Sequence, residues 1–226
     1  SGHEILFKNK MINHFGGVML ALIFIVPITA YKKVHHGHHL RNRTDLEMFD
    51  LYYSNDNKLI KTVYWYGILI GLYWLICASL TIMAAIVPSI CKILLKDKPL
   101  ATNSYSFVNA TKTNRSKIQL ESWSIILFQI GMFYLLDLKV TNYLVLYGMH
   151  SFFWSTQNYI NHAFSPRDIM NGAHNLKMNP LLKPFYLNWN YHLAHHQFPG
   201  VPWVHLSKFL ESKKLKDYGT AYLKMW

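Results

Sequence analysis

Long apolar segments separated by short polar segments dominate the hydrophobic pattern of the chain. The apolar segments cover residues 15–31, 63–95, 122–136 and 140–160. A helix needs about 20 apolar residues to cross the hydrocarbon core of a bilayer, and most of these segments approach or exceed that length. The pattern therefore predicts an all-α fold, an integral membrane helical bundle that forms a single domain over residues 1–226.

Two histidine triplets with the same spacing, His-x-x-His-His, flank the apolar segments. They are His35, His38 and His39, and His192, His195 and His196. On a helix, positions i, i+3 and i+4 share one face, so the rings of each triplet are expected to point the same way. Converging imidazoles suit Zn, Cu, Fe or Ni. One triplet is compatible with a surface cluster, but two of them predict a metal site.

Two further histidines constrain the topology, because His3 precedes segment 15–31 and His162 ends segment 140–160. If His3 shares a metal site with the first triplet, segment 15–31 cannot cross the membrane once. We therefore interpret it as a helix that lies in, or dips into, the membrane. The alternative is an ordinary span with His3 uninvolved. For the triplets and His162 to lie on the same side of the membrane, two or four crossings must separate His39 from His162.

Segment 63–95 is too long for one crossing. A helix of this length extends about 50 Å, whereas the hydrocarbon core is about 30 Å thick. The segment forms either a tight hairpin or one span with a helical extension, kinked at Pro88. The polar connection 96–121 is basic, which favours the cytoplasmic side and hence the hairpin.

The net charge is +12 with the histidines neutral. Residues 163–226 contain eight Lys or Arg residues, which predicts a cytoplasmic, histidine-rich cap on the bundle. No nucleic-acid-binding motif accompanies the basic residues, so the charge indicates contact with a lipid bilayer and no nucleic acid partner. Cys77 and Cys91 lie in an apolar segment and provide neither a disulfide framework nor a zinc site.

The histidine motifs resemble those of the membrane fatty acid desaturase and hydroxylase superfamily. The run from Asn190 to Trp203, which contains His-Leu-Ala-His-His-Gln-Phe-Pro-Gly-Val-Pro-Trp and is followed by Leu-Ser-Lys at 206–208, is similar to the third histidine box and its tail. The first triplet, followed by Asp45 and Glu47, resembles the second box. Asn-Tyr-Ile-Asn-His at 158–162 is similar to an extra histidine motif of alkane hydroxylases.

The first histidine box of the superfamily matches only in part. The run His-Glu-Ile-Leu-Phe-Lys at 3–8 fits the family pattern from its second histidine onward. We therefore expect the chain to be incomplete at the N-terminus, a fragment that begins inside this box and turns over little substrate by itself. The parent reading frame is expected to place a histidine three or four residues before His3.

The resemblance implies two iron ions held by histidine. The implied metal ligands are His3, His35, His38, His39, His162, His192, His195 and His196, with Asn158 reaching a metal through a water. Hydrogen-bond partners of the ligands are expected among Asp45, Glu47, Asp50, Asn161, Asn188, Asn190 and Gln197, each of which is about equally compatible with a structural role. We interpret His14, His36, His174 and His205 as ordinary polar residues, and His150 as a hydrogen-bonded packing residue.

The implied activity is oxygen-dependent desaturation of a fatty acyl chain, in a lipid or an acyl thioester. The implied electron donor is a ferredoxin or a cytochrome b5-type protein that docks on the basic cytoplasmic face. Aromatic segments 64–73 and 134–159 are expected to line a hydrocarbon tunnel or to face lipid. One alternative is a hydroxylase or ketolase of an alkane or carotenoid in the same superfamily. A distant alternative is a non-enzymatic membrane metal-binding or transport protein, which predicts histidines within the spans.

Overall fold

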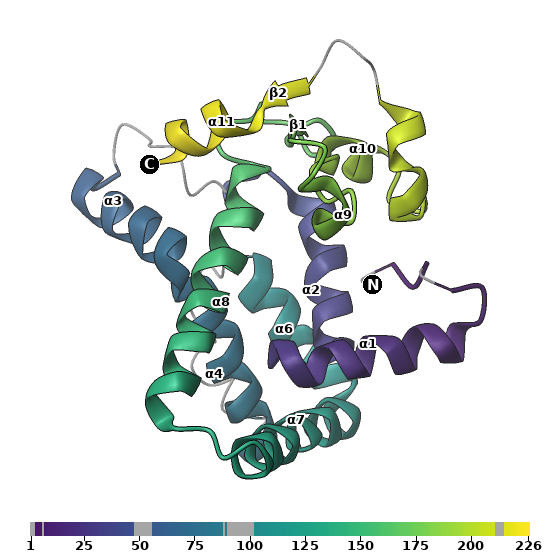
Figure 1. Cartoon of the computed structure of the whole chain (residues 1–226), viewed down its shortest axis with the longest axis vertical. Helices are drawn as coiled ribbons and strands as arrows, with labels where there is room; N and C mark the ends of the chain where they lie inside the picture. Colours follow the sequence, from purple (N-terminus) through teal and green to yellow (C-terminus); the bar gives the residue numbers. More distant parts are fainter. Residues whose placement is uncertain (1–2, 6, 48–55, 88, 90–101, 211–214) are drawn as a thin grey trace.

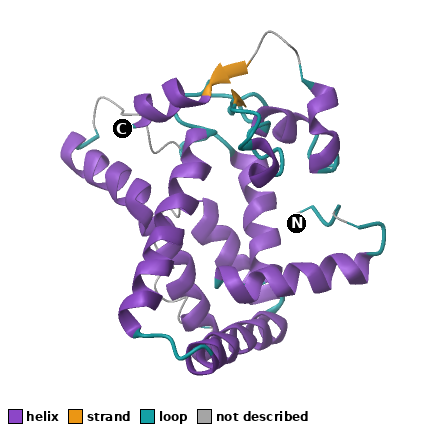
Figure 2. Cartoon of the chain, in the orientation of Figure 1, coloured by secondary structure: helices purple, strands orange, loops and turns teal. Residues whose placement is uncertain are grey.

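The computed structural model describes residues 3–5, 7–47, 56–87, 89, 102–210 and 215–226, and its regular structure is mainly helical (Figure 2). The first half contains α1 (Lys10–Phe24), α2 (Ile28–Arg41), α3 (Lys58–Gly67), the π-helix η1 (Ile68–Leu72), α4 (Tyr73–Ile86) and α6 (Thr102–Thr113). The second half contains α7 (Arg115–Leu135), α8 (Val140–Ile160), α9 (Lys183–Tyr186), α10 (His192–Gln197), the 3₁₀-helix η2 (Trp203–Phe209) and α11 (Tyr218–Met225).

A small parallel sheet corrects the prediction of an entirely α-helical fold. Strand β1 (Asn175–Lys177) pairs with β2 (Leu215–Asp217). Strands of three residues are too short to show the alternation by which a strand is recognised in a sequence. Leu176 of β1 joins Trp65, Ile160 and Met225 in a buried cluster, which fixes α11 against α3 and α8.

The helices connect two ends of the molecule (Figure 1). The continuous stretch α3–η1–α4 runs to one end, α7 lies across that end, and α8 returns to the other end, where α9, α10, α11 and the sheet gather. The stretches Lys58–Ile86 and Arg115–Leu135 are long and apolar enough to cross a membrane, and α1 with α2 adds a third only if the bent pair is one span. Helix α8 is not among these candidates, so a span over 140–160 stays a prediction.

Residues 58–121 differ from the predicted pattern. The irregularity in the central helix is the π-turn of η1, and Pro88, where a kink was expected, lies outside the described residues. The part of the expected polar connection that is described, 102–121, is almost entirely helical, because Phe107 and Ala110 of α6 are buried against α2 and α4. The Arg41 guanidinium lies 4.7 Å from the centroid of the Tyr105 ring, so α6 begins beside the end of α2. The return required by a hairpin falls between α4 and α6, mostly outside the described residues.

Gly71 allows α8 to pack closely against the π-turn. Its φ is 119°, a conformation that residues with a Cβ rarely adopt. The Gly71 carbonyl accepts a hydrogen bond of 2.7 Å from Ser151 Oγ, and a Cβ on Gly71 would overlap that hydroxyl.

Replacing Gly71 by alanine is expected to lower the free energy of unfolding by about 2–4 kcal/mol, because both the positive φ and the overlap with Ser151 oppose a side chain. Unfolding of the purified protein in detergent measures the change. Gly148→Ala in α8 is the matched control, since its Cβ would meet nothing within 4 Å; it should be neutral or stabilise by up to about 1 kcal/mol. Equal losses in the two variants would contradict the explanation.

Helices α1 and α2 meet at 94°, and side chains of neighbouring helices form hydrogen bonds with the backbone carbonyls at this bend. A helix end leaves backbone carbonyls without intrahelical partners, which is costly in lipid. Here four consecutive carbonyls accept hydrogen bonds from side chains of α4, α7 and α8: Gln129 donates to Leu22, Tyr147 to Ile23, Trp74 to Phe24 and Thr81 to Ile25. The polar tip of the bend is therefore covered by neighbouring helices.

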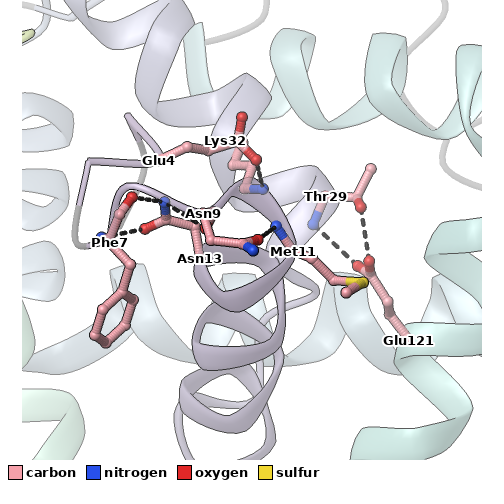
Figure 3. A network of polar contacts seen from close by, with 8 residues as sticks. All are labelled: Glu4, Phe7, Asn9, Met11, Asn13, Thr29, Lys32 and Glu121. Atoms are coloured by element: carbon pink, nitrogen blue, oxygen red, sulfur yellow. Dashed lines mark hydrogen bonds and ion pairs between the residues drawn. The ribbon is translucent and has the colours of Figure 1, made fainter.

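A side chain of α7 accepts hydrogen bonds from the first turn of α2. Glu121, which is 9% exposed, accepts hydrogen bonds from the backbone N–H of Thr29 at 2.9 Å and from the Thr29 hydroxyl at 2.6 Å (Figure 3). A carboxylate at this position also complements the positive end of the helix dipole. Glu121 thus anchors the helix that carries the first histidine triplet.

The N-terminal segment folds back beside α2. Glu4 pairs with Lys32, and the Asn13 side chain accepts a hydrogen bond of 2.9 Å from the Phe7 N–H (Figure 3). His3 Nε2 consequently lies 3.0 Å from His35 Nε2. The chain on either side of segment 15–31 therefore meets at one place, and the segment is not a straight span.

Candidate metal centre

Histidine rings from four parts of the chain converge where α2 and α8 end. The first histidine group contains His3, His35, His39 and His195, and the second contains His38, His162, His192 and His196. Within each group the candidate ligand atoms lie within 4.8 Å of one another. The ring centroids of His39 in the first group and His196 in the second are 4.4 Å apart, so the two groups adjoin. The eight histidines are those that the sequence predicts as ligands.

Each helical triplet divides between the two groups. On α2 the outer histidines of the triplet join the first group and the middle one joins the second; on α10 the outer histidines join the second group and the middle one joins the first. Residues four apart lie one above the other on a helix, whereas the intervening ring is displaced around the axis. The expected single shared face is therefore replaced by two adjacent faces, each serving one group.

The first group has the spacing of a metal site. His3 Nε2 lies 3.0 Å from His35 Nε2 and 3.1 Å from His39 Nε2, and His195 Nε2 lies 3.0 Å from His39 Nε2 and 3.3 Å from His35 Nε2. Four atoms at such spacings are about 2 Å from a common centre, which is the length of a metal–imidazole bond. A neutral imidazole can present an unprotonated ring nitrogen to a metal, so four Nε2 atoms at these spacings fit a metal ion.

Hydrogen bonds at Nδ1 orient two histidines of the second group. His38 Nδ1 donates to Glu47 Oε2 at 2.9 Å, and His162 Nδ1 donates to the Gly172 carbonyl at 2.9 Å. Each bond selects the tautomer in which Nε2 carries the lone pair. The arrangement is that of metal-binding histidines, whose second ring nitrogen is usually held by a carboxylate or a carbonyl.

The other two histidines of the second group are buried. His192 and His196 are each 4% exposed. Among the described residues, His192 Nδ1 and both ring nitrogens of His196 have no hydrogen-bond partner. Buried polar atoms without a partner cost about 1–3 kcal/mol each, and a bound cation would remove that cost at the nitrogens it contacts. The second group therefore also fits a metal ion.

Burial favours the neutral form of seven of the eight imidazoles. It lowers the pKa of His3 to about 4 and the pKa of His195 to about 3, and nearby histidines act in the same direction. The pKa values of His162, His192 and His196 are also lowered, first by burial and then by repulsion from neighbouring histidines. At neutral pH the ring nitrogens therefore offer lone pairs to a metal instead of binding protons.

Most of the predicted hydrogen-bond partners do not contact the ligands. Glu47 does, through His38, whereas Asp45 pairs with Arg167 and Asp50 lies outside the described residues. The four amides bond elsewhere: Asn161 donates to Gln157 O, Asn188 to Trp203 O, Asn190 to Leu176 O and Gln197 to Asn171 Oδ1. For these four the structural alternative is the one that the described contacts support.

Three contacts to the candidate ligands were not predicted from the sequence. The Tyr31 ring stacks on His35, with centroids 5.7 Å apart and planes 8° apart, and the Trp189 ring lies 4.9 Å from that of His192. Helical spacing pointed to Tyr31, which precedes His35 by one turn. The Gly172 carbonyl carries no side-chain signal, although a Cβ on Gly172 would overlap Arg43 and the Asp168 backbone.

The remaining histidines stay outside both groups. His14, His36, His174 and His205 do not join them, as expected. His150 packs against Phe24 and Trp74, with ring centroids 5.1 and 5.4 Å away, but its Nε2 has no hydrogen-bond partner among the described residues. The predicted packing role of His150 is therefore supported, but a hydrogen bond at its Nε2 is not.

Asn158 donates to the Trp154 carbonyl at 2.6 Å, and its water-mediated contact with a metal stays a prediction.

A cavity of about 120 Å³ adjoins the histidines between α2, α4 and α8. Aromatic side chains form much of its wall: Tyr31, Trp65, Tyr73, Trp154, Tyr159 and Trp189. Four of these belong to the aromatic segments that were expected to line a tunnel or to face lipid. In the same segments Tyr64, Tyr134 and Phe153 are exposed on the helix surfaces. The segments therefore supply both cavity-lining and exposed aromatic residues, and the hydrocarbon tunnel stays a prediction.

The mainly helical fold with candidate membrane spans and two adjacent four-histidine groups that could hold metal ions is that expected of a membrane metalloprotein. The fatty acid desaturase family model matches residues 1–226, and the chain belongs to that family. The resemblance seen in the histidine boxes is thereby confirmed, and the family is generally one of oxidoreductases. Comparison with curated proteins gave no match, and neither did comparison with solved structures.

Replacing Glu47 by glutamine is expected to weaken metal binding at the second group by about 10- to 100-fold, because His38 loses the carboxylate that orients its ring. Competition with a chelator, followed through the metal content of the purified protein, measures the change. Asp45→Asn is the control, since that carboxylate pairs with Arg167 at the surface. Equal affinities in the two variants would show that Glu47 does not position His38.

Proposed function

We propose that the chain carries the site for oxygen-dependent desaturation of a fatty acyl chain at two iron ions, one in each histidine group. The observation that carries this proposal is the adjacency of two four-histidine groups beside an aromatic-walled cavity. Family membership supports it, since members of the family use iron. The clustering of the histidines at helix ends disfavours a metal transporter, whose ligands are expected within the spans.

The protein residues have three tasks in this reaction. Neutral imidazoles hold the metals without cancelling their charge, so that the bound iron, when present, supplies the oxygen chemistry that breaks carbon–hydrogen bonds. Glu47 and the Gly172 carbonyl orient His38 and His162. The aromatic wall of the cavity excludes water and holds the hydrocarbon against the histidines, which positions the reacting carbons.

We further propose that the histidine end of the molecule faces the cytoplasm and receives a ferredoxin or a cytochrome b5-type donor. Lys177, Lys208 and Lys224 are exposed in the segment that forms this end of the molecule. An acidic electron carrier would be attracted to these lysines, and charge complementarity would raise the rate of encounter. Binding that weakens steeply as ionic strength rises would support a charge-guided encounter.

The proposed reaction is tested by expressing the open reading frame that encodes this chain in a host with simple lipids. Desaturation predicts oxygen uptake and a new double bond in the fatty acids, both lost with His196→Ala. A new hydroxyl or keto group on a hydrocarbon would instead assign the hydroxylase or ketolase alternative. Metal uptake into vesicles without oxygen consumption would refute an oxidative function.

A further inference from the structure

The cavity meets the two histidine groups unequally. Three members of the second group, His38, His162 and His192, line its wall, whereas His35 is the one member of the first group among the described lining residues. All four histidines of the first group are partly exposed, while two of the second group are buried. An occupant of the cavity would therefore approach the second group from within the protein.

Helix α8 and the turn that follows it run along the cavity to the second group. Trp154, Asn158 and His162 follow one another at four-residue intervals, and all three line the cavity. Residues at this spacing lie on one side of a helix. The wall thus passes from an indole, through an amide, to a candidate metal ligand.

Tyr31 lies against His35, the first-group histidine that lines the cavity. Its ring is stacked on the ring of His35, with planes 8° apart, so one face of the His35 ring is covered by a phenol. The edge of His35 that carries Nε2 meets His3 and His195 in the first group. A hydrocarbon in the cavity would therefore contact Tyr31 where it would otherwise contact His35.

We infer that the two metal positions have different roles, with the hydrocarbon substrate binding against the second histidine group and not against the first. This inference rests on the proposed function, in which both groups bind a metal. The occupant is an uncharged hydrocarbon segment, because aromatic rings form much of the wall and its two charged residues have partners within the protein: Arg43 donates to the Ser165 carbonyl, and Glu47 accepts from His38. The reacting carbons then lie beside His38, His162 and His192, and the first group lies behind them.

Cobalt(II) in one group at a time tests the inference without turnover. His195→Ala removes a ligand of the first group only, and His162→Ala removes a ligand of the second group only. Each variant is loaded with one equivalent of cobalt, and methyl octadecanoate is added in detergent. The visible spectrum of cobalt is expected to change in His195→Ala and to stay constant in His162→Ala. A change in His162→Ala, or no change in His195→Ala, would overturn the inference. If the unmodified chain bound no cobalt, the proposed function itself would be refuted, which distinguishes its failure from that of the inference.

A second pair of variants tests whether the probe acts from the cavity. Val34 lines the cavity, whereas Val145 is 61% exposed on α8. Val34→Phe is expected to weaken the cobalt response to methyl octadecanoate at least about tenfold, and Val145→Phe to leave it unchanged. Both variants should bind two cobalt ions per chain, which verifies their folding. An undiminished response in a cobalt-loaded Val34→Phe would place the probe outside the cavity and refute the inference.

Discussion

Replacing His196 by alanine is expected to reduce the tightly bound metal from two ions to one per chain. His196 belongs to the second group, is 4% exposed, and has no hydrogen-bond partner for either ring nitrogen among the described residues. Losing an outer partner of a metal ligand already costs 10- to 100-fold in affinity, and losing the ligand itself should cost more. Metal analysis after anaerobic loading with ferrous iron and gel filtration gives the number of ions retained.

The control for this prediction is another histidine. His205 is exposed and lies outside both groups, so His205→Ala should retain two ions. Desaturation by the expressed protein should disappear with His196→Ala and persist with His205→Ala. Two ions in the His196→Ala protein would show that this ring is not a ligand, whatever its position.

Replacing Glu121 by alanine is expected to lower the free energy of unfolding by about 3–5 kcal/mol. The substitution removes both acceptors of Thr29 and leaves a part-buried N–H without its partner, and hydrogen bonds to charged groups contribute about 1.5–3 kcal/mol each. Because α2 carries His35, His38 and His39, both histidine groups should bind metal less tightly as this helix loosens. Unfolding in detergent, with and without bound metal, measures the two effects.

The conservative change separates hydrogen bonding from packing. Glu121→Gln keeps the shape of the side chain and one acceptor oxygen, so we expect it to cost about 1–2 kcal/mol. Leu120→Ala is a neighbouring control, since Leu120 is 70% exposed, and it should change stability by less than about 1 kcal/mol. A Glu121→Ala protein as stable as Leu120→Ala would exclude an anchoring role.

The sequence was most informative where a spacing has a direct geometric meaning. The His-x-x-His-His triplets identified six of the eight grouped histidines, because residues three and four apart are neighbours on a helix surface even when they serve adjacent groups. The position of His3 favoured a helix that lies in or dips into the membrane over a straight span at 15–31, and the 94° bend between α1 and α2 agrees with it. Glu47 was recognisable as a partner because it is a carboxylate close in sequence to the ligands.

The features that the sequence did not reveal depend on contacts between distant residues. The division of each triplet between two groups follows from how α2 and α10 face each other across 150 residues of chain. The backbone carbonyl of Gly172 can be supplied by any residue type, so its bond to His162 leaves no pattern. Residues 102–121 appeared to be a connection because they are polar, but burial of Phe107 and Ala110 against other helices stabilises α6.

Iron K-edge X-ray absorption of the chain loaded anaerobically with two equivalents of ferrous iron tests the central claim most directly. The account predicts that both ions are retained, with nitrogen neighbours at about 2 Å and the outer scattering of imidazole rings. A shell dominated by oxygen or sulfur, without imidazole scattering, would contradict the assignment of the eight histidines to a pair of metal ions.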